Sequence, residues 1–338
     1  MHAKIMVLRI KRLAGAVLLA TCALAFSEPH ENAGAASFDM LLIGAGARPL
    51  AMGGAYTAVP GDIYSLYWNP AGIASIKKTT FMADYMRYAL DMEKGMPAFV
   101  IDGSKLGNAG TAGGYVNYFN AGSFEAVDEN GNRLEDEDFT AAYIEGGVSF
   151  ARQLPQMQGW DIAAGATFKG IAEYIADYRT TGLGFDFGVL CSPPVSALKL
   201  GATVKNLGTV FSSDTGSRMP MVFSAGLYFA SKEWRNARFA LDINKPLTSY
   251  YTIRLGGEYS LSRNFSVRAG RRFLENEVRH WIASLQGEEA GYVRENFNTW
   301  SFGVGIKPSA RMLFDAAVLG NTFQSLPFFQ FSVIFIAR

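Results

Sequence analysis

Apolar and other residues alternate along the chain from about residue 79 to the C-terminus. In 162–169, for example, the even positions hold Ile, Ala, Ala and Phe, whereas the odd positions hold Ala, Gly, Thr and Lys. Successive side chains of a strand point to opposite faces, so this pattern predicts β-strands. About fourteen such segments occur, near 79–88, 96–102, 110–119, 139–151, 160–171, 180–191, 197–207, 219–230, 235–244, 251–260, 264–273, 298–307, 310–319 and 327–336. Their even number and their lengths are typical of a membrane-spanning antiparallel β-barrel.

The second face of these segments carries small residues and scattered charges of both signs. A soluble β-sandwich also alternates, but its polar face meets bulk water and usually carries many charges. The mixed face favours a barrel lumen that is partly filled and partly wet. We therefore predict an all-β transmembrane antiparallel barrel of about 14 strands over residues 77–338. The expected lumen charges are Lys169, Lys205, Asp242, Arg254, Glu258 and Arg268.

The first residues have the pattern of an export signal. Four basic side chains precede an apolar run over 13–26, which is too short and wrongly flanked for a spanning helix. We expect a signal peptide over residues 1–25, with cleavage after Ala23-Leu24-Ala25 or as late as residue 35. A lipoprotein box ending at Cys22 is the alternative interpretation.

Residues 38–76 differ from the rest because they are rich in Gly and Ala and show little alternation. The segment is too short for a core of its own, and Pro49, Pro60 and Pro70 fix turns in it. A segment of this kind before the first strand is best stored inside the barrel. We therefore expect 38–76 to form an N-terminal hatch, or plug.

Two short motifs in this segment resemble a known family. One is Met52-Gly53-Gly54-Ala55, and the other is Asn69-Pro70-Ala71-Gly72 preceded by two aromatic residues. The stretch 47–75 resembles the opening of PorV/PorQ-type proteins, within the wider set similar to FadL-type outer-membrane transporters. The resemblance implies a hatch closed by the Asn-Pro-Ala turn. The hatch motif residues are then Met52, Gly53, Gly54, Asn69, Pro70, Ala71 and Gly72.

The sequence departs from the family pattern at two places. Pro60-Gly61-Asp62 stands where relatives usually have a run of acidic residues, so the hatch turn is expected to differ. The chain also ends in Ile336-Ala337-Arg338 and not in an aromatic residue, which departs from the usual assembly signal of outer-membrane barrels.

Composition gives little reason to expect chemistry. The formal charge of +1 creates no overall field toward nucleic acid. Of three histidines, only His280 is a candidate for catalysis with Ser284, and a surface position in a long polar segment explains it better. The acidic residues between 125 and 138 fit no dedicated calcium loop and suit a solvated hairpin tip. We expect no enzyme activity, no metal site and no cofactor.

Two functions follow from the resemblance, both in the bacterial outer membrane. The first is a PorV-like accessory of type IX-like protein secretion, whose partners would be the secretion channel or exported cargo proteins. The alternative is a FadL-like conduit for hydrophobic small molecules, which in some relatives leave through a lateral opening in the wall. A purely structural or adhesive barrel is a third class, because a fold does not fix a function. Outer-membrane lipid is an expected partner in each case, and nucleic acid in none.

Overall fold

The computed structural model describes most of the chain beyond the expected signal peptide. The described residues are 37–87, 92–107, 109–125, 133, 139–194, 197–211, 218–230, 236–275, 278, 299–320 and 327–337. The predicted signal peptide, the candidate pair His280 and Ser284, and most of the acidic loop lie outside these residues.

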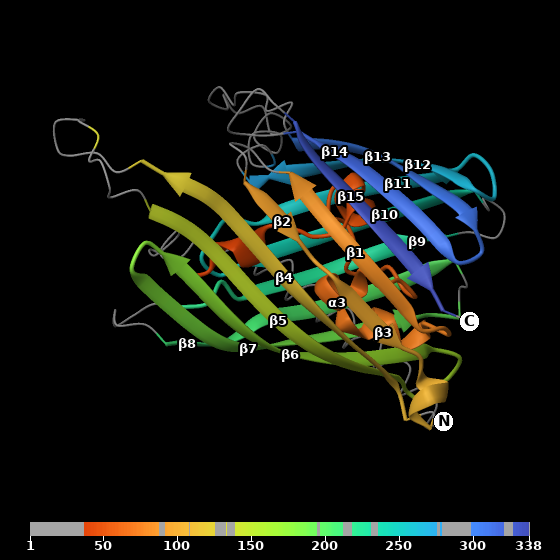
Figure 1. The fold of residues 1–338 in the computed structure, drawn as a ribbon. Helices are drawn as coiled ribbons and strands as arrows, with labels where there is room; N and C mark the ends of the chain where they lie inside the picture. The colour runs from red at the N-terminus through yellow and green to blue at the C-terminus, as the bar shows by residue number, and fades with distance from the viewer. Residues whose placement is uncertain are drawn as a thin grey trace, which may run out of the picture.

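Fifteen strand segments form one antiparallel sheet that closes on itself (Figure 1). They are β1 (Thr80–Arg87), β2 (Glu93–Gly95), β3 (Ala98–Ile101), β4 (Thr111–Phe124), β5 (Phe139–Gln153), β6 (Asp161–Ile175), β7 (Tyr178–Ser192), β8 (Leu198–Phe211), β9 (Val222–Phe229), β10 (Ala237–Pro246), β11 (Thr252–Ser260), β12 (Phe265–Leu274), β13 (Trp300–Ser309), β14 (Met312–Leu319) and β15 (Phe328–Ile336). Closure is made by β15 and β1, with Thr80 opposite Ile336. Because β2 and β3 both pair with β1 and β4, they share one position, and the barrel has 14 strands. The predicted barrel is confirmed.

The interruption between β2 and β3 lies at Met96 and Pro97. The sequence pattern predicts one strand near 96–102, but the ladder begins earlier, at residue 93, and breaks here. Proline has no N–H to donate, which explains an irregular point in the strand. Its neighbours keep the wall connected: Met96 N donates to Asp84 O at 2.9 Å, and Val116 N donates to Pro97 O at 3.0 Å.

The burial pattern of the wall is the reverse of that in a soluble sandwich. On β6, Phe168 is 47% exposed and faces outward, whereas its neighbour Lys169 is 3% exposed and faces the lumen. Exposed side chains on other strands are also large and apolar, including Phe81, Phe99, Phe150, Phe185, Phe187, Phe239, Phe302 and Phe331. An apolar outer face with buried charges inside suits a barrel whose outer surface meets lipid.

The two rims of the barrel differ in the length of their connections. The rim near Thr80 and Ile336 has short turns, such as 261–264 between β11 and β12. The opposite rim carries the long connections after β4 and β12, and β4 to β8 are 14 or 15 residues long, beyond what a bilayer needs. One turn differs from its prediction: Pro308 lies within β13, where the register shifts, and the turn falls at Ala310 and Arg311.

Residues 37–76 form short helices that lie within the barrel (Figure 1). They are η1 (Asp39–Leu42), α2 (Ala47–Ala51), α3 (Ser65–Trp68) and η2 (Pro70–Ser75), and a further turn, η4 (Gly103–Leu106), lies on the wall. η2 contacts β5, β6 and β7, whereas α2 contacts β12, β13 and β14, so the segment reaches both sides of the lumen. Within the described ranges, no helix has the length and apolar character to cross a bilayer.

Candidate functional site

The Asn69-Pro70-Ala71-Gly72 turn is fixed by the side chain of Asn69. Its Oδ1 accepts from Ala71 N at 3.1 Å and caps η2, while Pro70 occupies the first turn, where its missing N–H costs nothing. Nδ2 donates to Thr57 O at 2.6 Å and to Val189 O of β7 at 3.2 Å. One buried amide therefore joins two parts of the segment to the barrel wall.

Two positions of the wall that face this turn are glycines. A Cβ on Gly188 would lie 2.0 Å from Asn69 Oδ1, and a Cβ on Gly165 would lie 2.5 Å from the backbone of Pro70 and Ala71. These strand glycines let the two backbones approach closely. The motif and the glycines of β6 and β7 are one packed unit.

The Met52-Gly53-Gly54 motif docks on the other side of the lumen. Gly53 and Gly54 have φ of +67° and +76°, which only glycine adopts without strain. Gly53 N donates to Ser301 Oγ of β13 at 3.1 Å. A Cβ on Gly270 of β12 would lie 2.0 Å from Gly53 N, so Gly270 admits the motif in the way that Gly188 admits Asn69.

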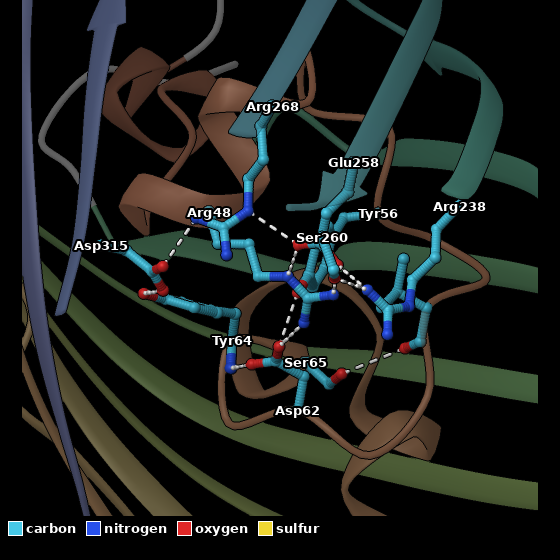
Figure 2. Close-up of polar contacts among 11 residues, drawn as sticks. Arg48, Tyr56, Asp62, Tyr64, Ser65, Arg238, Glu258, Ser260, Arg268 and Asp315 are labelled. Atoms are coloured by element: carbon cyan, nitrogen blue, oxygen red, sulfur yellow. Dashed lines mark hydrogen bonds and ion pairs between the residues drawn. The ribbon is translucent and has the colours of Figure 1, made fainter. Parts of the chain in front are cut away.

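A buried ionic network links α2 to the wall (Figure 2). Arg48 Nε donates to Glu258 Oε2 of β11 at 2.7 Å, and its Nη1 donates to Asp62. Arg238 of β10 also donates to Glu258, at 2.7 Å, but its side chain is 32% exposed. Figure 2 shows Arg48 between Asp62 and Glu258, so one guanidinium bridges the segment and the wall.

The same network extends across β12 to β14. Arg268 donates to Glu258 at 2.7 Å and to Asp315 at 2.6 Å, and Tyr64 Oη donates to Asp315 at 3.0 Å. Burial raises the pKa of the Tyr64 hydroxyl well above its ordinary value, so it stays protonated and remains a donor. Three carboxylates and three arginines are therefore held inside the barrel by mutual pairing.

A second buried network lies on the β4–β8 side. Lys169 Nζ is 2.9 Å from Asp186 and 3.5 Å from Glu145. Glu145 also accepts from Tyr115 Oη at 2.8 Å and from Asn117 Nδ2 at 3.0 Å. Lys169 therefore compensates the buried charges of Asp186 and Glu145, so this network has a structural role.

A cavity of about 560 Å³ separates the segment from the inner faces of β8 to β12, toward the rim with the long connections. Tyr67 and Trp68 of α3 form one side. Lys205, Arg254 and Arg272 project from the strands, and among the lining residues that the structure describes there is no carboxylate. The cavity therefore combines aromatic and apolar surface with positive charge.

The two cations nearest the aromatic side chains lie against their rings. Lys205 Nζ is 4.7 Å from the centroid of Tyr67, and the Arg254 guanidinium is 5.6 Å from that of Trp68. Such contacts attract a cation to the ring face. Asp242, the carboxylate opposite Arg254 in the β10–β11 register, accepts from Tyr56 N at 2.7 Å and from Thr57 N at 2.8 Å.

The six predicted lumen charges thus fall into separate places. Glu258 and Arg268 meet in the first network, Lys169 lies in the second, Lys205 and Arg254 line the cavity, and Asp242 holds the backbone of the segment. Arg48 and Asp315 were not predicted as lumen charges, and Asp62 was expected only to mark a departure from the family pattern. One feature of the sequence could have identified Arg48: it is the one basic residue between 37 and 76.

Among the described residues, no group of His, Cys, Asp and Glu is placed to hold a metal ion. The buried carboxylates are instead paired with arginine or lysine, or accept from backbone N–H groups. The arrangement can bind and position a ligand in the cavity.

No family model matches the chain, and no curated protein matches its sequence. Solved structures do share its fold. The toluene transporter TodX of Pseudomonas putida matches with a TM-score of 0.58 at 13% identity, over 87% of this chain and 96% of that one. The CymD monoaromatic hydrocarbon channel matches with a TM-score of 0.53 at 11% identity, over 88% and 97%. These similar structures are FadL-family channels, and nothing in the comparisons is specific to PorV/PorQ proteins.

Proposed function

We propose that this protein is an outer-membrane conduit for hydrophobic small molecules, with residues 38–76 acting as its hatch. The observation that carries the proposal is the cavity of about 560 Å³ between Tyr67 and Trp68 of that segment and the inner wall. Its size lies within the range of ligand pockets, and its lining is aromatic and apolar with a few polar groups, as such pockets are.

The comparisons favour this function over the secretion accessory that we expected first. TodX is described as a toluene transporter and CymD as a monoaromatic hydrocarbon channel, and both have this barrel. The PorV/PorQ resemblance covers about thirty residues of the hatch, and nothing in the comparisons supports a secretion partner. The hatch motifs serve either function equally well, because they pack against the wall.

In this proposal the networks hold the hatch and the cavity receives the ligand. Arg48 and Asn69 fasten two separate points of the segment to β11 and β7. Tyr67 and Trp68, which precede Asn69, face the cavity, so a ligand entering from the long-loop rim meets the hatch first. Passage to the other rim requires the segment to move or a gap to open beside it.

The test is uptake through a barrel whose cavity has been filled. Thr252 lines the cavity from the start of β11, and Thr252→Trp would occupy it without altering either network. Tyr259→Trp, on the exposed outer face of the same strand, is the matched control. We expect cells that depend on this barrel to take up toluene several-fold more slowly with Thr252→Trp, and at the normal rate with Tyr259→Trp. Equal rates in all three, or loss of exported surface proteins on deletion of the gene with unchanged uptake, would reject the conduit.

A further inference from the structure

A groove of about 530 Å³ crosses the outer face of β8 to β13, on the side of the wall that faces away from the lumen. Its rims are large exposed side chains, including Phe239, Leu255 and Trp300. Its floor is made by Gly257 and Ala269, which lie opposite each other in the β11–β12 register. A Cβ on Gly257 would meet no heavy atom closer than 3.9 Å, which is ordinary van der Waals contact, so the floor can take a side chain without a clash.

A positive charge lies at one end of this groove. Arg271 is two residues beyond Ala269 on β12 and faces outward, opposite Leu255 on one side and Trp300 on the other. Its guanidinium is 4.4 Å from the Phe273 centroid and 5.1 Å from that of Trp300. The two rings hold the planar cation in place on the outer wall.

The direction of the groove is fixed by the strands. β12 ends at Leu274 and β13 begins at Trp300, both at the rim with the long connections. Arg271 therefore lies near that rim, and the floor runs from it toward the middle of the wall. Aromatic residues and arginine at this level are placed where lipid headgroups meet the hydrocarbon region.

We propose that this groove is a specific site for an anionic phosphate lipid. The phosphate would accept hydrogen bonds from Arg271, and one acyl chain would lie over Gly257 and Ala269. Charge complementarity and the orientation of the groove favour this occupant, since a lipid of that leaflet has its headgroup at the rim and its chains below. The site is on the outer wall, so it goes beyond the proposed conduit and does not depend on it.

Native mass spectrometry of the full barrel can count retained lipids. The probes are dioleoyl phosphatidic acid and, with the same chains, zwitterionic dioleoyl phosphatidylcholine. We expect one molecule of phosphatidic acid to be retained, with affinity at least about tenfold weaker in Arg271→Gln, as for loss of a charge-assisted hydrogen bond. Gly257→Leu should weaken retention similarly by filling the floor while leaving Arg271 unchanged.

Two controls make the same chemical changes elsewhere. Arg87→Gln removes an outward-facing arginine from the same rim, and Gly146→Leu fills an outward-facing position on β5 where a Cβ meets nothing. Both should retain the lipid as the unaltered barrel does. The proposal would be overturned if Arg271→Gln and Gly257→Leu retained the lipid as well as the unaltered barrel does, or if the two controls lost it to the same extent as these variants. It would also be overturned by equal retention of phosphatidylcholine, or by a second copy of the chain bound in place of lipid.

Discussion

Arg48 and Glu258 are 210 residues apart in the chain, yet Arg48 Nε lies 2.7 Å from Glu258 Oε2 inside the barrel. Both side chains are largely buried, and Asp62 and Arg268 complete their pairing. A buried ion pair contributes little net stability over an apolar pair, but removal of one partner leaves a charge without compensation. The pair therefore determines the position of α2 in the lumen, and it contributes little to the stability of the barrel.

Replacing Arg48 should free the segment while the barrel stays closed. Arg48→Gln leaves Asp62 without its arginine, and we expect a loss of about 3 kcal/mol in the local stability of residues 37–76. Hydrogen exchange should rise in that segment and stay unchanged in β4 to β8. Arg238→Gln removes another partner of Glu258 from a more exposed position and should cost under about 1 kcal/mol. Similar exchange in the two variants would show that Arg48 is not a fastening point.

Close packing of Gly270 on Gly53 gives a second prediction. Gly270→Ala would place a Cβ 2.0 Å from Gly53 N, in contact with backbone that cannot rotate away. We expect about 1–3 kcal/mol of lost unfolding free energy, the usual cost of overpacking. Gly146→Ala adds the same methyl group where nothing lies within 4 Å. Urea unfolding of the two proteins in detergent makes the comparison, and equal midpoints would refute the packing argument.

The sequence predicted the wall better than it predicted the hatch contacts, for a physical reason. Alternation is local: one strand such as β6 exposes Phe168 on the outer face and buries Lys169 in the lumen, and this depends on the order of its own residues. Closure and the count of strands follow from repeating that pattern. The break at Pro97 and the register shift near Pro308 depend on the pairing of neighbouring strands. The break was therefore not predicted, and the register shift lies where a turn was expected.

Contacts across the lumen could not be predicted because no short-range pattern encodes them. The alternation predicts that Glu258 and Arg268 face the lumen. Arg48 joins their ionic network only when α2 packs against the inner wall beside β11. Gly53 and Gly54 have positive φ, so their positions require glycine and stand out as a motif in the sequence. Gly270, which packs against Gly53, has no such mark, because glycine also occurs elsewhere in the strands. The role of 38–76 as a hatch remains a prediction.

The amide of Asn69 provides a third prediction. Asn69→Asp keeps the oxygen that caps η2 but loses the donor to Thr57 O and Val189 O, and directs a carboxylate at both carbonyls. Each lost donor should cost about 1–3 kcal/mol in unfolding free energy. Asn120→Asp also keeps its acceptor, toward Gly122 N, and is solvent-exposed, so it should change little. If both variants unfold at the same urea concentration, the amide is not a clasp.

If the barrel is a conduit as proposed, the charge of its cavity predicts which molecules it passes most readily. Lys205 and Arg254 lie against aromatic rings, and the described lining holds no carboxylate. The carboxylate of an amphipathic ligand would therefore form an ion pair with one of these cations, whereas a neutral hydrocarbon has no charge with which to do so. We expect Lys205→Met to slow uptake of a long-chain carboxylate about tenfold, because a hydrogen bond to a charged group contributes about 1.5–3 kcal/mol. Uptake of toluene should stay within about twofold, since Met preserves the apolar stem of the side chain. Lys199→Met is the control on the same strand, because Lys199 bonds Ser192 outside the cavity. Competition uptake of the two labelled compounds by one culture measures the ratio directly, and a ratio that does not change in Lys205→Met would mean that the cavity charge takes no part in selection.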